Sequence, residues 1–149
     1  MIKLFLVILS SMFTCYAQSQ IDFKNKALRK EVNSFLKDLK KSKLEIISIV
    51  FEATEIDDTL YFSISNAYPD ITKIKSYTAY KGVYFCFGTG FPLDGYYEVV
   101  NNQPVPSFLK KAFEDRRKGS ISVFNEPITK YLTFWNGKLV ESIIENKDQ

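Results

Sequence analysis

The chain contains no histidine in its 149 residues. Histidine is the commonest general base, the commonest metal ligand in proteins and the usual group that titrates near neutral pH. Its absence excludes Ser-His-Asp and Cys-His catalytic sites and argues against most zinc sites. The composition therefore favours a protein that is not an enzyme and that holds neither a metal nor a cofactor.

Cysteine is also scarce, because the chain has only Cys15 and Cys86. Cys15 lies in an N-terminal segment that we expect to be removed, which would leave Cys86 alone and exclude an intramolecular disulfide. Cys86 lies in the apolar run 83–87, which is typical of a strand. This setting favours a buried, inert thiol over a nucleophile.

Residues 1–17 have the pattern of a secretory signal peptide. Lys3 precedes the apolar run 4–9, and the segment 15–17 ends in Ala17, a small residue of the kind that signal peptidase requires. The apolar run is shorter than the roughly 20 residues that a helix needs to span a bilayer. We therefore predict cleavage after Ala17, export to the periplasm or the exterior, and a single domain over residues 18–149 without stable membrane insertion. Lipidation of Cys15 and retention of the segment as an uncleaved anchor are the alternatives.

The net charge of the chain is close to balanced. It is +3 for the whole sequence and +2 once Lys3 leaves with the signal peptide, which argues against nucleic acid as the main partner. The basic residues nevertheless form two clusters near the ends of predicted helices, where cations complement the helix dipole. An anionic partner is the alternative explanation. The clusters are Lys37, Lys40, Lys41 and Lys43, and then Lys110, Lys111, Arg116, Arg117 and Lys118.

The hydrophobic pattern predicts two helices and a series of strands. Apolar residues at helical spacing predict helices over 22–41, with Asp22 as the N-cap, and over 106–119. Alternating or β-branched runs predict strands over 44–56, 60–65, 76–80, 83–87, 96–100, 121–124, 129–135 and 138–144. Asn136-Gly137 predicts a type I′ hairpin turn. We expect an α+β fold in helix-meander-helix-meander order: an antiparallel sheet of about six to eight strands, with two helices packed on one face.

Aromatic residues crowd the segment around a loop at 88–95, which contains three glycines and Pro92. Tyrosine is enriched at protein interfaces because its rigid ring can be buried while its hydroxyl stays hydrated. The loop lacks the spacing and the following helix of a phosphate-binding turn. The segment thus predicts a surface that binds another protein, formed by Tyr80, Lys81, Tyr84, Phe91, Asp94, Tyr96 and Tyr97.

These features predict a small exported binding protein without enzymatic activity. It would act as an inhibitor or immunity-type protein, by steric occlusion of its protein partner. Two alternatives stay open. One is a periplasmic carrier of a small apolar ligand, held under the sheet. The other is a hydrolase that uses the carboxylates of Asp94 or Glu98, which would have to be buried in a cleft.

Overall fold

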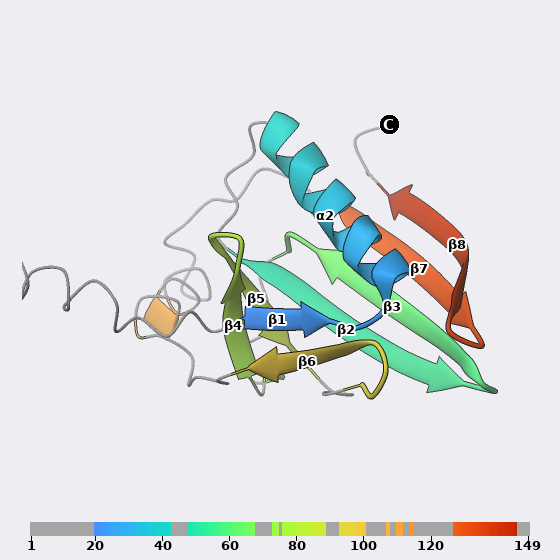
Figure 1. Cartoon of the computed structure of the whole chain (residues 1–149). Helices are drawn as coiled ribbons and strands as arrows, with labels where there is room; N and C mark the ends of the chain where they lie inside the picture. Colours follow the sequence, from blue (N-terminus) through green and yellow to red (C-terminus); the bar gives the residue numbers. More distant parts are fainter. Residues whose placement is uncertain are drawn as a thin grey trace, which may run out of the picture.

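The computed structural model describes residues 20–42, 48–67, 73–74, 76–88, 93–100 and 127–145, together with Ser107, Lys110, Lys111 and Glu114. These residues form one bounded helix and eight strands (Figure 1). The predicted signal peptide, the predicted strand 121–124 and Phe91 lie outside the described residues, as does most of the second predicted helix. No helix in the described part of the chain is both long and apolar enough to cross a membrane.

The helix α2 spans Lys26–Lys41 and starts at a different cap from the predicted one. The side chain of Asn25 accepts hydrogen bonds from the backbone amides of Ala27 at 3.0 Å and Leu28 at 3.1 Å, which satisfies two amides of the first turn. The prediction of Asp22 as the N-cap is wrong, because Asp22 lies in strand β1. The predicted apolar stripe is confirmed: Leu28, Val32, Phe35, Leu36 and Leu39 are all buried.

Strands β1 (Gln20–Phe23) and β6 (Tyr97–Val100) form a two-stranded antiparallel sheet of their own. Phe23 lies opposite Tyr97 in the register, and both side chains are buried. Residues 96–100 were expected to form a strand of the single antiparallel sheet. Instead β6 pairs with the segment that precedes the helix, which shows no strand alternation long enough to predict it.

The main sheet has six strands in the order β4-β5-β2-β3-β7-β8. Two-residue turns join the members of its three hairpins, and both residues of each turn have positive φ, including Asn136 at 48° and Gly137 at 73° as predicted. The strands are β2 (Ile49–Ile56), β3 (Thr59–Ser65), β4 (Ser76–Tyr80), β5 (Val83–Phe87), β7 (Thr129–Trp135) and β8 (Lys138–Glu145).

The predicted fold class is wrong in two respects. The sheet is mixed, because β2 runs parallel to β5, with Val50 opposite Cys86. Only α2 is a bounded helix in the described residues, so the expected pair of helices on an antiparallel sheet is not what the structure has. The reason is the choice of strand partners. One side of β3 pairs with β2 and the other with β7, so the β4-β5 hairpin joins the sheet on the side of β2 that faces away from β3. Hydrophobic alternation predicts which residues of a strand are buried, but it does not predict which other strand will pair with it.

The core lies between the six-stranded sheet and a second layer formed by α2 and the β1-β6 ribbon, which cover the same face of the sheet (Figure 1). Phe51 is at its centre, and its ring centroid lies 5.1 Å from that of Tyr97, 5.5 Å from Phe62 and 5.6 Å from Phe87. Each such ring contributes about 1.5–3 kcal/mol when it is removed from water. We call the covered face of the sheet the inner face and the opposite one the outer face.

Candidate functional site

Tyr97, a predicted contact residue, is part of the core. Its side chain is 2% exposed, and its ring stacks on Phe87 at 5.6 Å and meets Phe51 edge-on. Burial raises the pKa of the Tyr97 hydroxyl far above its ordinary value. In this position the side chain supports the sheet from within and presents almost no surface to a partner.

Tyr96 and the two carboxylates considered for hydrolysis lie beside Tyr97 in the chain. The half-buried ring of Tyr96 packs edge-on against Phe134 at 5.4 Å and also contacts Phe62. Burial raises the pKa of Tyr96, although a hydrogen bond with the Gly137 backbone acts against this. Asp94 and Glu98 are both exposed. The buried carboxylate that the hydrolase alternative requires is therefore not found at these two positions.

The other predicted residues are divided between the two faces of the sheet. Tyr80 lies on the inner face, where its ring meets Phe23 edge-on at 5.2 Å and its hydroxyl donates to Asn33 Oδ1 at 3.2 Å. Lys81 is exposed in the following turn. Tyr84 points to the outer face and contacts the ring of Tyr77 at 5.9 Å. The structure thus does not bring the six described residues into one surface; Phe91, the seventh, lies outside the described residues.

A different set of large apolar side chains is gathered on the outer face. They come from strands β2, β3, β7 and β8; in the first three strands they alternate with buried core residues, whereas β8 has no buried residue. Trp135, the single tryptophan of the chain, is 56% exposed, and Tyr61 and Tyr131 are each 44% exposed. We call this set the outer aromatic surface; its members are Ile56, Tyr61, Tyr131, Trp135 and Ile143.

The strand register places these side chains next to one another. Tyr131 lies directly opposite Ile143 on β8 and Ser63 on β3, and Trp135 lies opposite Thr59. Tyr61 is thus the diagonal neighbour of both Tyr131 and Trp135, at a spacing of about 7–8 Å that aromatic side chains can bridge. The result is a continuous strip across three strands, supported from below by the rigid core.

Acidic residues border the strip. Glu141 accepts a hydrogen bond from Thr133 at 3.4 Å, and Glu52 and Glu145 are exposed on the same face. Burial, with a hydrogen bond to Glu145 and the charge of that carboxylate, raises the pKa of Tyr131. A hollow of about 290 Å³ lies beside Tyr131, between the ends of β2, β3 and β7. Lys138 lies opposite Trp135 in the register, and Lys73 lines the hollow, so the border also carries positive charge. The surface therefore combines aromatic area, a mixed charged border and a recess.

The sequence contained a signal for this surface that we did not use. In β3 the residues Leu60, Phe62 and Ile64 predict the buried face, which leaves Tyr61 on the opposite one. In β7, Tyr131 and Trp135 alternate in the same way with Leu132 and Phe134. A single exposed aromatic residue is common on protein surfaces, whereas several that form a contiguous patch can indicate an interaction site. Only the register shows that three such positions lie side by side.

The described residues offer little for catalysis. They contain no group of three or more His, Cys, Asp or Glu side chains placed to hold a metal ion. Cys86 is fully buried, as predicted, and burial raises its pKa to about 11 despite a hydrogen bond from Ser48, so it is not a reactive thiolate. Comparison of the chain with protein-family models, with curated proteins and with solved structures finds no match.

Proposed function

We propose that the chain is an exported, non-enzymatic binding protein. It would bind another protein through its outer aromatic surface and act by steric occlusion of that partner. The observation that carries the proposal is the exposure of Tyr61, Tyr131 and Trp135 side by side on one sheet face. Monomeric proteins rarely expose contiguous apolar area of this kind unless it binds something. The export half of the proposal rests on the signal-peptide pattern of residues 1–17.

The residue types on this surface suit protein recognition. Tryptophan and tyrosine are the commonest hot-spot residues of protein interfaces, because a large rigid ring loses little conformational entropy on burial. The rings lie on strands of the main sheet, so they are held in place before the partner arrives, which lowers the entropic cost of binding. A broad, rigid sheet face is also a suitable shape for blocking access to a partner's surface.

The charge pattern indicates what kind of partner surface fits. Glu52, Glu141 and Glu145 border the rings, and Lys138 and Lys73 lie on the same face, so carboxylates exceed amines there by one. Aromatic faces themselves attract cations. A partner that presents lysine or arginine side chains among apolar residues would find both its charges and its apolar groups matched. The expected partner is therefore a protein with a basic and partly apolar patch.

Site-directed photocrosslinking in the native host tests the proposal. A photoreactive phenylalanine analogue replaces Tyr61 or Tyr131 in one set of chains, and replaces Lys30, an exposed residue of α2, in the control. We expect one discrete adduct with a protein from positions 61 and 131, and none from position 30. Adding Trp135→Ala should weaken that adduct at least about tenfold, the effect of losing a modest hot spot.

Two results would contradict the proposal. One is the absence of any adduct from positions 61 and 131 in exported, folded protein. The other is the same set of adducts from position 30, which would mean that the rings make random encounters only. Because Trp135 is more than half exposed, its substitution should leave the fold intact, and circular dichroism of the variant checks this.

A further inference from the structure

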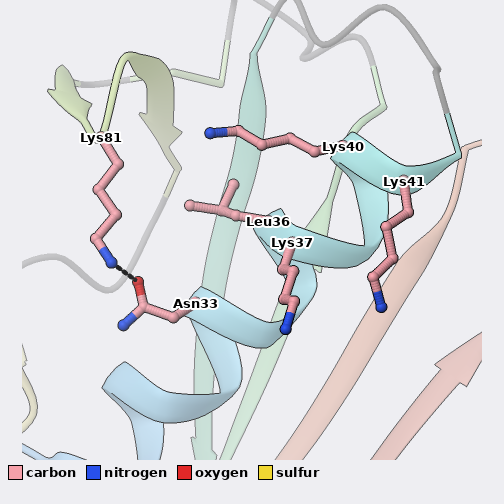
Figure 2. Close-up of a pocket in the computed structure, with 6 residues that line it drawn as sticks. All are labelled: Asn33, Leu36, Lys37, Lys40, Lys41 and Lys81. Atoms are coloured by element: carbon pink, nitrogen blue, oxygen red, sulfur yellow. Dashed lines mark hydrogen bonds between the residues drawn. The ribbon is translucent and has the colours of Figure 1, made fainter.

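A second feature lies on the other side of the molecule, between the C-terminal half of α2 and the β4-β5 turn. Here the structure has a cavity of about 410 Å³, lined by Asn33, Leu36, Lys37, Lys40, Lys41 and Lys81 (Figure 2). This volume is within the range of sites that bind small molecules. Four of the six lining residues are lysines, so the cavity is strongly positive. We call it the lysine pocket.

The lysines of this pocket come from two elements that are brought together only in the folded chain. Lys37, Lys40 and Lys41 come from α2, where lysines near the C-terminus complement the helix dipole. Lys81 comes from the β4-β5 turn, where it has a φ of 50°, a conformation that is uncommon for a residue other than glycine. Figure 2 shows Lys40 and Lys81 extending into the space from its two sides, with Leu36 between them.

Asn33 orders the pocket. Its Oδ1 accepts hydrogen bonds from the Lys81 amine at 2.6 Å and from the Tyr80 hydroxyl at 3.2 Å. Two donors on one oxygen settle which end of the amide faces them, because the amide nitrogen cannot accept. Asn33 thus holds the Lys81 amine in position at one side of the pocket.

Among the residues that the structure describes, few carboxylates accompany these lysines. In the described part of the chain, the ion pair formed by a pocket lysine joins Lys41 to Asp38 at 3.8 Å, and both side chains are largely exposed. Lys37 and Lys40 form no ion pair with a described residue. Like charges held together are destabilising unless an anion neutralises them. The arrangement therefore favours the binding of an anion from outside the chain.

We propose that the lysine pocket binds a phosphate-bearing anion, with the amines of Lys40 and Lys81 donating to phosphate oxygens and Asn33 positioning Lys81. The ammonium group of lysine pairs with phosphate as a point charge. It does not need the planar, two-point geometry by which an arginine guanidinium group binds. Lys37 and Lys41 add long-range attraction at the rim, and Leu36 with the lysine methylene groups contacts the organic part of the ligand. The phosphate could belong to a free small molecule or to a lipid headgroup.

The proposal is tested by measuring how two probes bind to the protein, which is expressed with its complete sequence. The probes are pyrophosphate, followed by calorimetry and by amide chemical shifts, and vesicles of phosphatidylglycerol against vesicles of phosphatidylcholine. The test variant is Lys40→Gln with Lys81→Asn, since asparagine tolerates positive φ. The control variant is Lys26→Gln with Lys138→Gln, which removes the same charge from exposed positions outside the pocket.

We expect pyrophosphate to bind, to shift the amide signals of Asn33 and Lys81, and to bind at least about tenfold more weakly to the test variant. The control variant should keep the affinity of the unmodified protein. If only phosphatidylglycerol vesicles bind, with the same difference between variants, the ligand phosphate belongs to a headgroup. Failure of both probes to bind, or an equal loss in the two variants, would overturn the proposal, because the attraction would then be due to net charge alone.

Discussion

The ion pair between Glu31 and Lys130 offers the sharpest test of the packing described above. The Lys130 amine lies 2.6 Å from Glu31 Oε2, and the two side chains are 5% and 16% exposed. The pair joins α2 to β7, and Ser142 on β8 adds a hydrogen bond to the same oxygen at 3.0 Å. Two charges are thus held together where water scarcely reaches.

The magnitude of a perturbation follows from this burial. At an effective dielectric constant of about 20, charges 2.6 Å apart attract by about 6 kcal/mol, and desolvation of the two ions costs several kcal/mol each. The intact pair therefore contributes little net stability. Glu31→Gln removes one charge and leaves Lys130 buried without its counter-ion, so we expect a loss of about 3–5 kcal/mol. That is a large share of the roughly 5–15 kcal/mol of a typical domain.

Urea unfolding followed by circular dichroism measures this loss. Fluorescence is a poor choice, because Trp135 is exposed before unfolding. The double variant Glu31→Leu with Lys130→Met should recover to within about 1 kcal/mol of the unmodified protein, since no charge is left buried. Asp38→Asn, which breaks the exposed pair with Lys41 on the same helix, should leave the unfolding midpoint unchanged.

The pH dependence gives a second readout of the same pair. Burial alone would raise the pKa of Glu31, but the hydrogen bonds from Lys130 and Ser142 lower it below its ordinary value of 4.5. A carboxyl group with a lowered folded pKa stabilises the protein above the unfolded pKa, and that stability is lost as the pH falls through the folded value. The difference between the unmodified protein and Glu31→Gln should therefore be full above about pH 4.5 and shrink below it. Two results would refute this reasoning. One is a loss of less than about 1 kcal/mol in the free energy of unfolding of Glu31→Gln. The other is a double variant whose loss equals the sum of the losses of its two single variants.

Three further predictions concern the core, a turn and the cysteine. Tyr97→Ala should cost about 3–5 kcal/mol in urea unfolding, because it empties the centre of an aromatic cluster; a smaller loss would place Tyr97 outside the core. Gly137→Ala should cost about 1–2 kcal/mol, seen as a lower melting temperature, because φ is +73° although no atom lies within 4 Å of the added Cβ. Cys86 should resist a thiol reagent at pH 8 in folded protein and react once urea is added, since its pKa is about 11 and its side chain is fully buried.

Features that depend on neighbouring residues were predictable. The apolar stripe of α2, the strands β3, β4 and β5 and the Asn136-Gly137 hairpin all lie where periodicity and turn chemistry place them. The prediction of a buried Cys86 is confirmed for the same reason, because an apolar run between turns has to be covered. The cap at Asn25 was missed because Asp22 and Asn25 are both good capping residues, and only the pairing of β1 with β6 excludes the first.

The candidate sites were less predictable than the strands that carry them. Composition singled out the tyrosines near the glycine loop, but it could not tell that Tyr97 faces the core or that Tyr80 and Tyr84 face opposite ways. The lysines of α2 were visible as a run in the sequence. Their partner Lys81 was not, because it comes from a turn about forty residues further along and reaches Asn33 only in the folded chain.

The sequence by itself determined the strands of the main sheet, the apolar stripe of α2 and the position of the Asn136-Gly137 turn, but not strand β1. These properties arise from steric preferences and side-chain periods that act over a few residues. Tertiary structure alone decided that β2 pairs in parallel with β5, that the β1-β6 ribbon shares the inner face with α2, and that Tyr61, Tyr131 and Trp135 meet on the outer face. The physical reason is that strands of similar pattern can pair in several orders, and the choice between them depends on which apolar faces, far apart in the sequence, meet in the core.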